Sequence, residues 1–161
     1  MKKTIVLFGI LLLSYVNYAQ TFPLISQREA EKILGRPAHL SSHSAETKDQ
    51  IIKYRYTYTA NDRETDQNRQ SNLFYMVEEY ESPSAAEKAF RYIISQNAGM
   101  QGMSVLKGYG DEAIIQTDND HFQLIIVRKS KRMIRLKVNK VTKTTSLEEL
   151  KKVTTKITGE L

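Results

Sequence analysis

The sequence predicts an α+β fold in which an antiparallel sheet of about five strands is covered by three helices. Two kinds of apolar periodicity support this prediction. Segments with a period near 3.6 residues indicate helices, and segments with a period of two indicate strands. They follow the order α-β-β-α-β-β-β-α along the chain. Short connections join the strands within each run, which is typical of antiparallel neighbours.

The first residues have the layout of a secretory signal peptide. Lys2 and Lys3 precede an apolar run from Ile5 to Leu13, and Ala19 offers a small residue for cleavage. That run is too short to cross about 30 Å of hydrocarbon, so we expect removal rather than a membrane anchor. We therefore expect residues 1–19 to be a signal peptide and residues 20–161 to be one exported domain. It would be periplasmic or extracellular, with no transmembrane span.

The expected mature chain is basic and contains no cysteine. The whole chain has 24 Lys and Arg residues and 18 Asp and Glu residues. Loss of Lys2 and Lys3 would leave 22 basic residues against 18 acidic ones, a net charge of +4. Without cysteine the chain can form neither disulfides nor thiolate metal sites, and it has no cysteine nucleophile.

A helix is predicted over residues 26–34. Ser26 and Glu29 form a capping box, in which each side chain accepts a hydrogen bond from the other residue's backbone N–H. Gly35 ends the helix and Pro37 prevents it from restarting.

Residues 38–50 are polar and are expected to be a connection, and residues 51–60 alternate as a half-buried strand does. The predicted core face of this strand carries Tyr54, Tyr56 and Tyr58. Exposed tyrosines that stack on sugar rings are the alternative. We favour the core, because Lys53 and Arg55 mark the opposite face as the solvated one.

The returning strand, over residues 72–80, is apolar on both faces, so we expect helices or a partner on each face of the sheet. Ser82 and Pro83 then begin a helix that ends near Gly99. Its predicted core stripe comprises Ala86, Ala89, Phe90, Ile93 and Ile94, with Phe90 and Ile93 as anchors.

Three further strands are predicted over residues 112–117, 121–129 and 132–141. Tight polar turns join them, at Asp118 to Asp120 and at Ser130 and Lys131. A last helix begins at Ser146, and its apolar stripe comprises Leu147, Leu150, Val153 and Ile157.

Two short motifs imitate ligand-binding sites. Residues 108–113 fit the dinucleotide pattern G-x-G-x-x-A, but a strand follows them where the pyrophosphate requires a helix N-terminus. We interpret them as a turn in which Asp111 accepts hydrogen bonds from local backbone amides. Asp118 opens an imperfect calcium-loop pattern, which has Gln123 where the loop needs glycine, so we predict a hairpin turn there.

His39 and His43 are the candidate metal ligands. They are four residues apart, and Glu46 or Asp49 would be a third ligand. A small metal-dependent hydrolase at this site is the alternative to a binding protein. We favour exposed loop histidines, since zinc sites need three or four converging ligands. We expect no cofactor.

The segment "VLKGYGDEAIIQ" resembles small exported bacterial envelope proteins, among them actinobacterial secreted lipoproteins and PsbP-like domains. The resemblance lies in Gly108, Gly110 and residues 111–113, which lead into a β-hairpin. It extends in outline to the helices near residues 30–38, 82–90 and 146–153. The chain lacks the cysteines of those lipoproteins. The resemblance implies an α+β fold and a non-catalytic envelope role, and it transfers no active site.

The strongest charge feature is a basic segment near the C-terminus. Residues 121–147 contain eight Lys and Arg residues and no acidic one. The candidate anion-binding or partner-binding residues are Arg128, Lys129, Lys131, Arg132, Arg135 and Lys137. Nucleic acid is not expected as the ligand, because an exported protein seldom meets it and no aromatic residues interleave the exposed positions.

We therefore expect a non-enzymatic binding or accessory module of the cell envelope, whose partner is an anionic envelope component or an acidic protein. The alternative for the basic segment is a solvated strand whose charges prevent edge-to-edge pairing.

Overall fold

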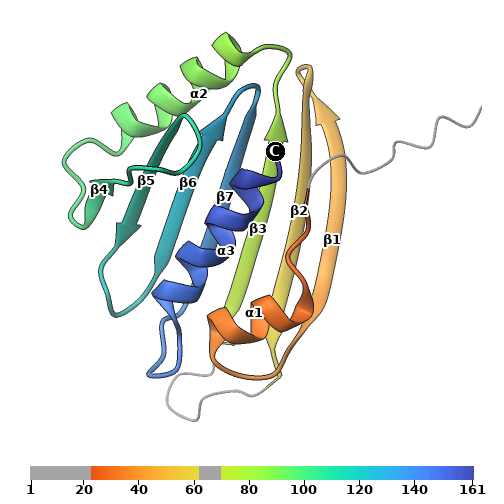
Figure 1. Cartoon of the computed structure of the whole chain (residues 1–161), viewed down its shortest axis with the longest axis vertical. Helices are drawn as coiled ribbons and strands as arrows, with labels where there is room; N and C mark the ends of the chain where they lie inside the picture. The colour runs from red at the N-terminus through yellow and green to blue at the C-terminus, as the bar shows by residue number, and fades with distance from the viewer. Residues whose placement is uncertain (1–22, 62–69) are drawn as a thin grey trace, which may run out of the picture.

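The computed structural model describes residues 23–61 and 70–161 as an α+β fold (Figure 1). The predicted signal peptide lies outside these residues. The helices are α1 (Gln27–Leu34), α2 (Pro83–Gln96) and α3 (Leu147–Gly159). The strands are β1 (Ala38–Lys48), β2 (Ile51–Ala60), β3 (Asn72–Glu79), β4 (Met103–Val105), β5 (Glu112–Thr117), β6 (Gln123–Lys129) and β7 (Arg132–Val138).

All seven strands form one antiparallel sheet with the order β1-β2-β3-β7-β6-β5-β4. The α+β class, the three helices and the antiparallel sheet are confirmed, but the predicted number of about five strands was too low. Residues 38–48 are a strand rather than a connection, and the three residues of β4 were not predicted.

The strand β1 escaped prediction because it lies at the edge of the sheet. Only Ala38 is buried, and the other residues of β1 are exposed. Its extended backbone is held by hydrogen bonds to β2, whereas its side chains bury almost no apolar surface. A strand fixed in this way shows no alternation of apolar and polar residues.

Helices α1 and α3 cover one face of the sheet, called here the α1/α3 face (Figure 1). The core on this face includes Ile33, Leu34, Tyr58, Tyr75, Ile134, Leu136, Leu150, Val153 and Ile157. The tyrosines that the sequence assigned to the core lie here, with Tyr56 and Tyr58 buried and Tyr54 partly buried. Two tyrosine hydroxyls bond the segment before α1, with Tyr58 donating to the Ile25 carbonyl and Tyr75 donating to the Pro23 carbonyl.

The predicted capping box of α1 is confirmed. The Ser26 backbone N–H donates to Glu29 Oε2 over 2.8 Å, and the Glu29 N–H donates to Ser26 Oγ over 3.3 Å. Glu29 also accepts from Lys156 Nζ over 2.8 Å, which ties α1 to α3. Burial would raise the pKa of Glu29, but the hydrogen bonds from Lys156 and Ser26 outweigh it and hold the pKa below its usual value.

Helix α2 covers part of the opposite face, called here the α2 face. Its Ser82 cap and Pro83 start are as predicted. Phe90 is buried against Ile114, Ile126 and Met133 on β5, β6 and β7. Ile93, the second predicted anchor, is only partly buried. On the same face, the side chains of β2 are half-exposed, and on β3 Phe74 is exposed and Met76 half-exposed while Glu78 is buried, so α2 covers only one half of it.

The helices within residues 23–61 and 70–161 include none that is both long and apolar enough to cross a bilayer.

Candidate functional site

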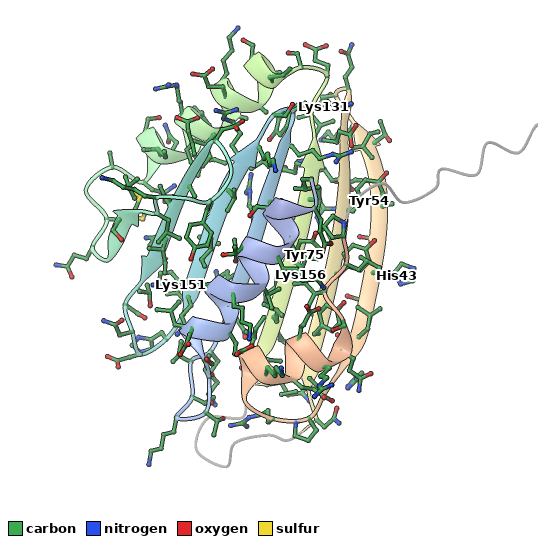
Figure 2. The ribbon with its side chains drawn as sticks, in the orientation of Figure 1. His43, Tyr54, Tyr75, Lys131, Lys151 and Lys156 are labelled. Carbon is green, nitrogen blue, oxygen red and sulfur yellow. The ribbon has the colours of Figure 1, made fainter. Side chains whose placement is uncertain are left out.

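The six predicted anion-binding residues lie on the hairpin of β6 and β7, but they do not share one surface. Arg132 lies opposite Lys129 across the hairpin, and both belong to the α1/α3 face, where Lys129 reaches α3. Arg135 and Lys137 lie on the α2 face, in register with Ile126 and Leu124. Figure 2 shows Lys131 at the end of the sheet, where the two strands turn.

Four of these six residues form ion pairs with carboxylates of neighbouring strands. Arg128 pairs with Asp111 and Glu112, both at 2.8 Å. Lys131 and Arg132 share Glu79, at 2.7 and 3.1 Å. Arg135 Nη2 lies 2.7 Å from Glu78. The excess of basic residues along the sequence is therefore balanced in space by acidic residues from elsewhere in the chain.

Ion pairing affects the pKa of Glu79. Burial would raise the pKa of this carboxyl, but hydrogen bonds from Lys131 and Arg132 outweigh burial and lower the pKa below 4.5. The side chains of Arg128 and Arg132 are only 12% and 17% exposed. A basic docking surface would need these side chains to be exposed, but the two arginines pack against their acidic partners.

The remaining two residues of the set have other contacts. Lys129 Nζ donates to the Thr158 carbonyl over 2.6 Å, at the C-terminal end of α3, where the helix dipole favours a positive charge. Lys137 is exposed, and its Nζ lies 5.7 Å from the centre of the Phe122 ring. Within the described ranges, Lys137 makes no ion pair with a carboxylate.

The candidate metal ligands His39 and His43 lie on opposite faces of the sheet. A β-bulge interrupts the register between Leu40 and Ser42, so that His39 lies opposite Thr59 and His43 lies opposite Tyr56. His43 stacks on Tyr56 with 6.4 Å between the ring centres, on the α1/α3 face. His39 Nδ1 is 2.7 Å from Asn61 Oδ1. Figure 2 shows His43 beside the edge strand β1.

Because of this bulge the two imidazoles cannot hold one metal ion. Glu46, a proposed third ligand, pairs instead with Arg55 at 2.7 Å. Within residues 23–61 and 70–161, no group of three or more His, Asp and Glu side chains is placed to bind a metal.

The glycine turn before β5 is confirmed as a turn, with Gly108 and Gly110 at φ of 85° and 56°. Asp111 does not bond local amides as predicted. Its Oδ2 accepts from the Ser130 N–H over 2.7 Å and from Arg128 over 2.8 Å, so it ties this turn to the β6–β7 turn. The second predicted turn is confirmed, with Asp118 Oδ1 accepting from the backbone N–H groups of residues 120–122.

A groove on the α2 face is the strongest candidate for a ligand site. Its volume is about 560 Å³, within the range of roughly 300–1,000 Å³ that is typical of small-molecule sites. It lies where the cover of α2 ends and the open part of the sheet begins. Its apolar lining includes Phe74, Met76, Ile93, Ile114, Leu124 and Ile126, and its polar lining includes Arg55, Thr57, Asn97, Gln116, Arg135 and Lys137.

Strand register places these residues in an ordered row. Arg55, Met76, Arg135, Ile126 and Ile114 lie directly opposite one another across β2, β3, β7, β6 and β5. Neighbouring strands are about 4.8 Å apart. The row is thus cationic on the open side of β7 and apolar on the side covered by α2.

The two sides meet at Arg135. Its Nη2 is bonded to Glu78, whose side chain is only 4% exposed and also pairs with Lys53 at 3.1 Å. The Nε of Arg135 is buried and has no hydrogen-bond partner among the described residues. A buried N–H without a partner costs about 1–3 kcal/mol. Because this atom is buried, a ligand in the groove would contact the part of the Arg135 side chain that stays exposed, about 30% of its surface, rather than Nε.

Sequence reasoning identified Arg135 and Lys137 but missed the other groove residues. Arg55 was assigned to a solvated face, and Phe74 and Met76 were not considered as ligand contacts. The signal that could have found them was present, because residues 72–80 are apolar on both faces. Phe74 remains 38% exposed on a face that α2 does not reach.

No protein-family model, curated protein or solved structure matches this chain. The resemblance to exported envelope proteins of the lipoprotein and PsbP-like groups therefore stays a prediction. The case for a function rests on the geometry of the groove.

Proposed function

We propose that this chain is an exported, non-enzymatic binding module of the cell envelope, which takes an amphipathic anion into the groove on the α2 face. The observation that carries the proposal is the row from Arg55 to Ile114, with guanidinium groups at one end and isoleucines at the other. A ligand that matches this row has one charged end and one apolar end.

Charge supports an anion in particular. Arg55, Arg135 and Lys137 line the groove, and no carboxylate of the described part of the chain does. Glu46 and Glu78 neutralise part of this charge from outside the lining. The effective dielectric near a protein surface is lower than that of bulk water, which strengthens the attraction between the remaining positive charge and an anionic group.

Export is proposed from the sequence of residues 1–19, and an envelope location supplies amphipathic anions in quantity. The proposed role is binding rather than catalysis, because no catalytic motif is recognisable in the sequence. The hydrolase alternative relied on His39 and His43 acting together, and their opposite orientations give it no support.

The test uses anilinonaphthalene sulfonate, an apolar fluorescent anion, with the purified folded protein. We expect saturable binding of one molecule per chain. Ile93→Gln should weaken this binding at least tenfold, because it removes an apolar contact from the groove. The matched control is Tyr92→Gln, since the neighbouring Tyr92 is 65% exposed and does not line the groove.

Near-UV circular dichroism of each variant, which is lost when the core loosens, tests whether dye binding comes from a loosened core that also binds such dyes. Absence of saturable dye binding by the folded protein, or equal loss in both variants, would contradict the proposed function.

A further inference from the structure

We infer that the natural occupant of the groove is a single-chain fatty carboxylate, with its hydrocarbon chain under α2 and its carboxylate at Arg135 and Lys137. This inference rests on the proposed function and names the class of ligand for the same groove.

The apolar end of the groove fits one flexible hydrocarbon chain. Its aliphatic walls come from Ile114 on β5, Leu124 and Ile126 on β6, and Ile93 on α2. Gln116 on β5 and Asn97 at the end of α2 add polar groups to the same side. Phe74, an aromatic side chain of the lining on the α2 face, lies on the open side of β7 and not among these aliphatic walls.

The charged end fits a monoanion with two oxygens. Arg135 and Lys137 are two residues apart on β7, so both side chains lie on the α2 face. Lys137 is exposed and makes no ion pair among the described residues, and the Arg135 side chain keeps about 30% of its surface exposed beside its pair with Glu78. A carboxylate presents two acceptor oxygens, one for each donor.

The net charge of the site also favours a carboxylate over a phosphate monoester. Arg135 already shares Glu78 with Lys53, which leaves part of its charge compensated. A phosphate monoester would bring a charge of about −1.5 to −2 and a third oxygen, and it is better matched by a cluster of unpaired arginines.

The position of the two ends fixes the orientation of the ligand. Strand β7 is the boundary, because Ile126 and Leu124 lie opposite Arg135 and Lys137 on the covered side, and Met76 and Phe74 lie opposite them on the open side. A carboxylate on β7 therefore keeps its head near solvent while its chain extends over β6 and β5 beneath α2.

The experiment is displacement of bound anilinonaphthalene sulfonate by defined amphiphiles below their micelle concentrations. Dodecanoate should displace the dye, whereas dodecanol and dodecyltrimethylammonium should be at least tenfold weaker. Across octanoate, decanoate and dodecanoate, each added pair of methylenes should tighten binding roughly fifteenfold if both are buried. An affinity that does not rise with chain length, or equal displacement of the dye by dodecanol and dodecanoate, would overturn the inference.

Variants test the charged end. Lys137→Gln should weaken dodecanoate about fivefold or more and leave dodecanol unchanged. Lys137 is exposed, so Lys137→Gln should fold normally. Arg135→Gln is a poorer choice, because it would leave the buried Glu78 with fewer partners. The control Lys152→Gln removes the same charge from α3, on the other face, where the side chain is 71% exposed. Equal effects of the two variants would contradict a carboxylate at β7.

The outcomes separate the two proposals. If the dye binds saturably and dodecanoate does not displace it, the fatty carboxylate is ruled out and the amphipathic-anion groove stands. If dodecyl phosphate displaces the dye at lower concentration than dodecanoate does, the ligand's head group is a phosphate and not a carboxylate. Failure of the dye itself to bind would remove the proposed function and this inference together.

Discussion

Arg128 Nε lies 2.8 Å from Oε2 of Glu112, the residue directly opposite it across the β5–β6 pair. The second partner of Arg128, Asp111, lies one residue before Glu112. A residue predicted as part of a free basic surface therefore joins two strands and a turn.

This relationship changes the test of electrostatic docking by the hairpin, which stays a prediction. Lys129→Gln combined with Lys131→Gln removes two charges and leaves Arg128 and Arg132 in their ion pairs. If the hairpin docks on an anionic surface, this variant should co-sediment less than wild type with anionic vesicles at low salt. At high salt the difference should vanish, because the Debye length falls to about 3 Å at 1 M.

The matched control for hairpin docking is Lys151→Gln combined with Lys152→Gln, which removes the same charge from α3. Figure 2 shows Lys151 on α3, away from Lys131 at the hairpin turn. If wild type and both variants sediment equally, the basic segment does not dock on anionic surfaces and is only a solvated, internally paired region.

Breaking the ion pairs of Arg128 should lower stability. Arg128→Gln should cost about 1–3 kcal/mol, because the side chain is 12% exposed and its loss leaves two carboxylates close together. The measurement is urea unfolding followed by circular dichroism. The control is Lys152→Gln, whose 71% exposed side chain pairs with Glu149 on the same helix and should contribute less than about 1 kcal/mol. A cost for Arg128→Gln no larger than that of the control would contradict the prediction.

Stability should depend on pH through Glu79. The folded-state pKa of this carboxyl lies below its ordinary value of 4.5. Its contribution is therefore fully present above about pH 4.5 and is lost as the pH falls through the lower folded-state pKa. The difference in unfolding free energy between wild type and Glu79→Gln should be about 1–3 kcal/mol at pH 7 and should shrink below pH 4.5. A difference that does not change between pH 7 and pH 3 would contradict the role of the ionised carboxylate.

Phe90 anchors α2 to the sheet. Phe90→Ala should cost about 3–5 kcal/mol, as truncation of a buried aromatic side chain does. Phe90 is 2% exposed, whereas Tyr92, on the same helix, is 65% exposed. Tyr92→Ala should change stability by less than about 0.5 kcal/mol. Thermal unfolding of both variants is the measurement, and similar shifts in melting temperature would show that α2 does not pack through Phe90.

Gly35 and Gly99 both have positive φ, but only Gly35 lies close to another part of the chain, so replacing each by alanine distinguishes the cost of backbone strain from that of steric contact. A Cβ on Gly35 would lie 1.9 Å from the Thr144 carbonyl oxygen, whereas a Cβ on Gly99 would meet nothing within 4 Å. Gly99→Ala should cost about 1–2 kcal/mol for the left-handed conformation alone. Gly35→Ala should cost about 2–5 kcal/mol, since a displaced backbone adds to that strain. Equal costs would contradict the close approach of Gly35 to the segment before α3.

Export remains a prediction from the sequence. Mass spectrometry of the protein isolated from its producing cell should show a chain that begins at Gln20, with or without conversion to pyroglutamate. Recovery of a chain with an intact Met1 from the cytosolic fraction would contradict it, and would reopen nucleic acid as a partner of the basic segment.

The sequence by itself determined the elements whose apolar faces are buried and whose ends are capped. Ser26 and Glu29 specified the start of α1, and the tyrosines of β2 and the stripe containing Phe90 specified which faces are inside. These signals are local, because a capping box and an apolar period act within a few residues.

Only the tertiary structure decided where charges and ligand-binding residues meet. β1 is a strand because β2 supplies hydrogen bonds to it, and one bulge in that pair sends His39 and His43 to opposite faces. Glu78 and Glu79 neutralise basic residues more than fifty positions away in the chain. The groove forms because the sheet order places β3 beside β7 and β2 beside β3, and leaves both strands beyond the reach of α2. Strand pairing over such separations depends on the fit of whole surfaces, which no short stretch of sequence encodes.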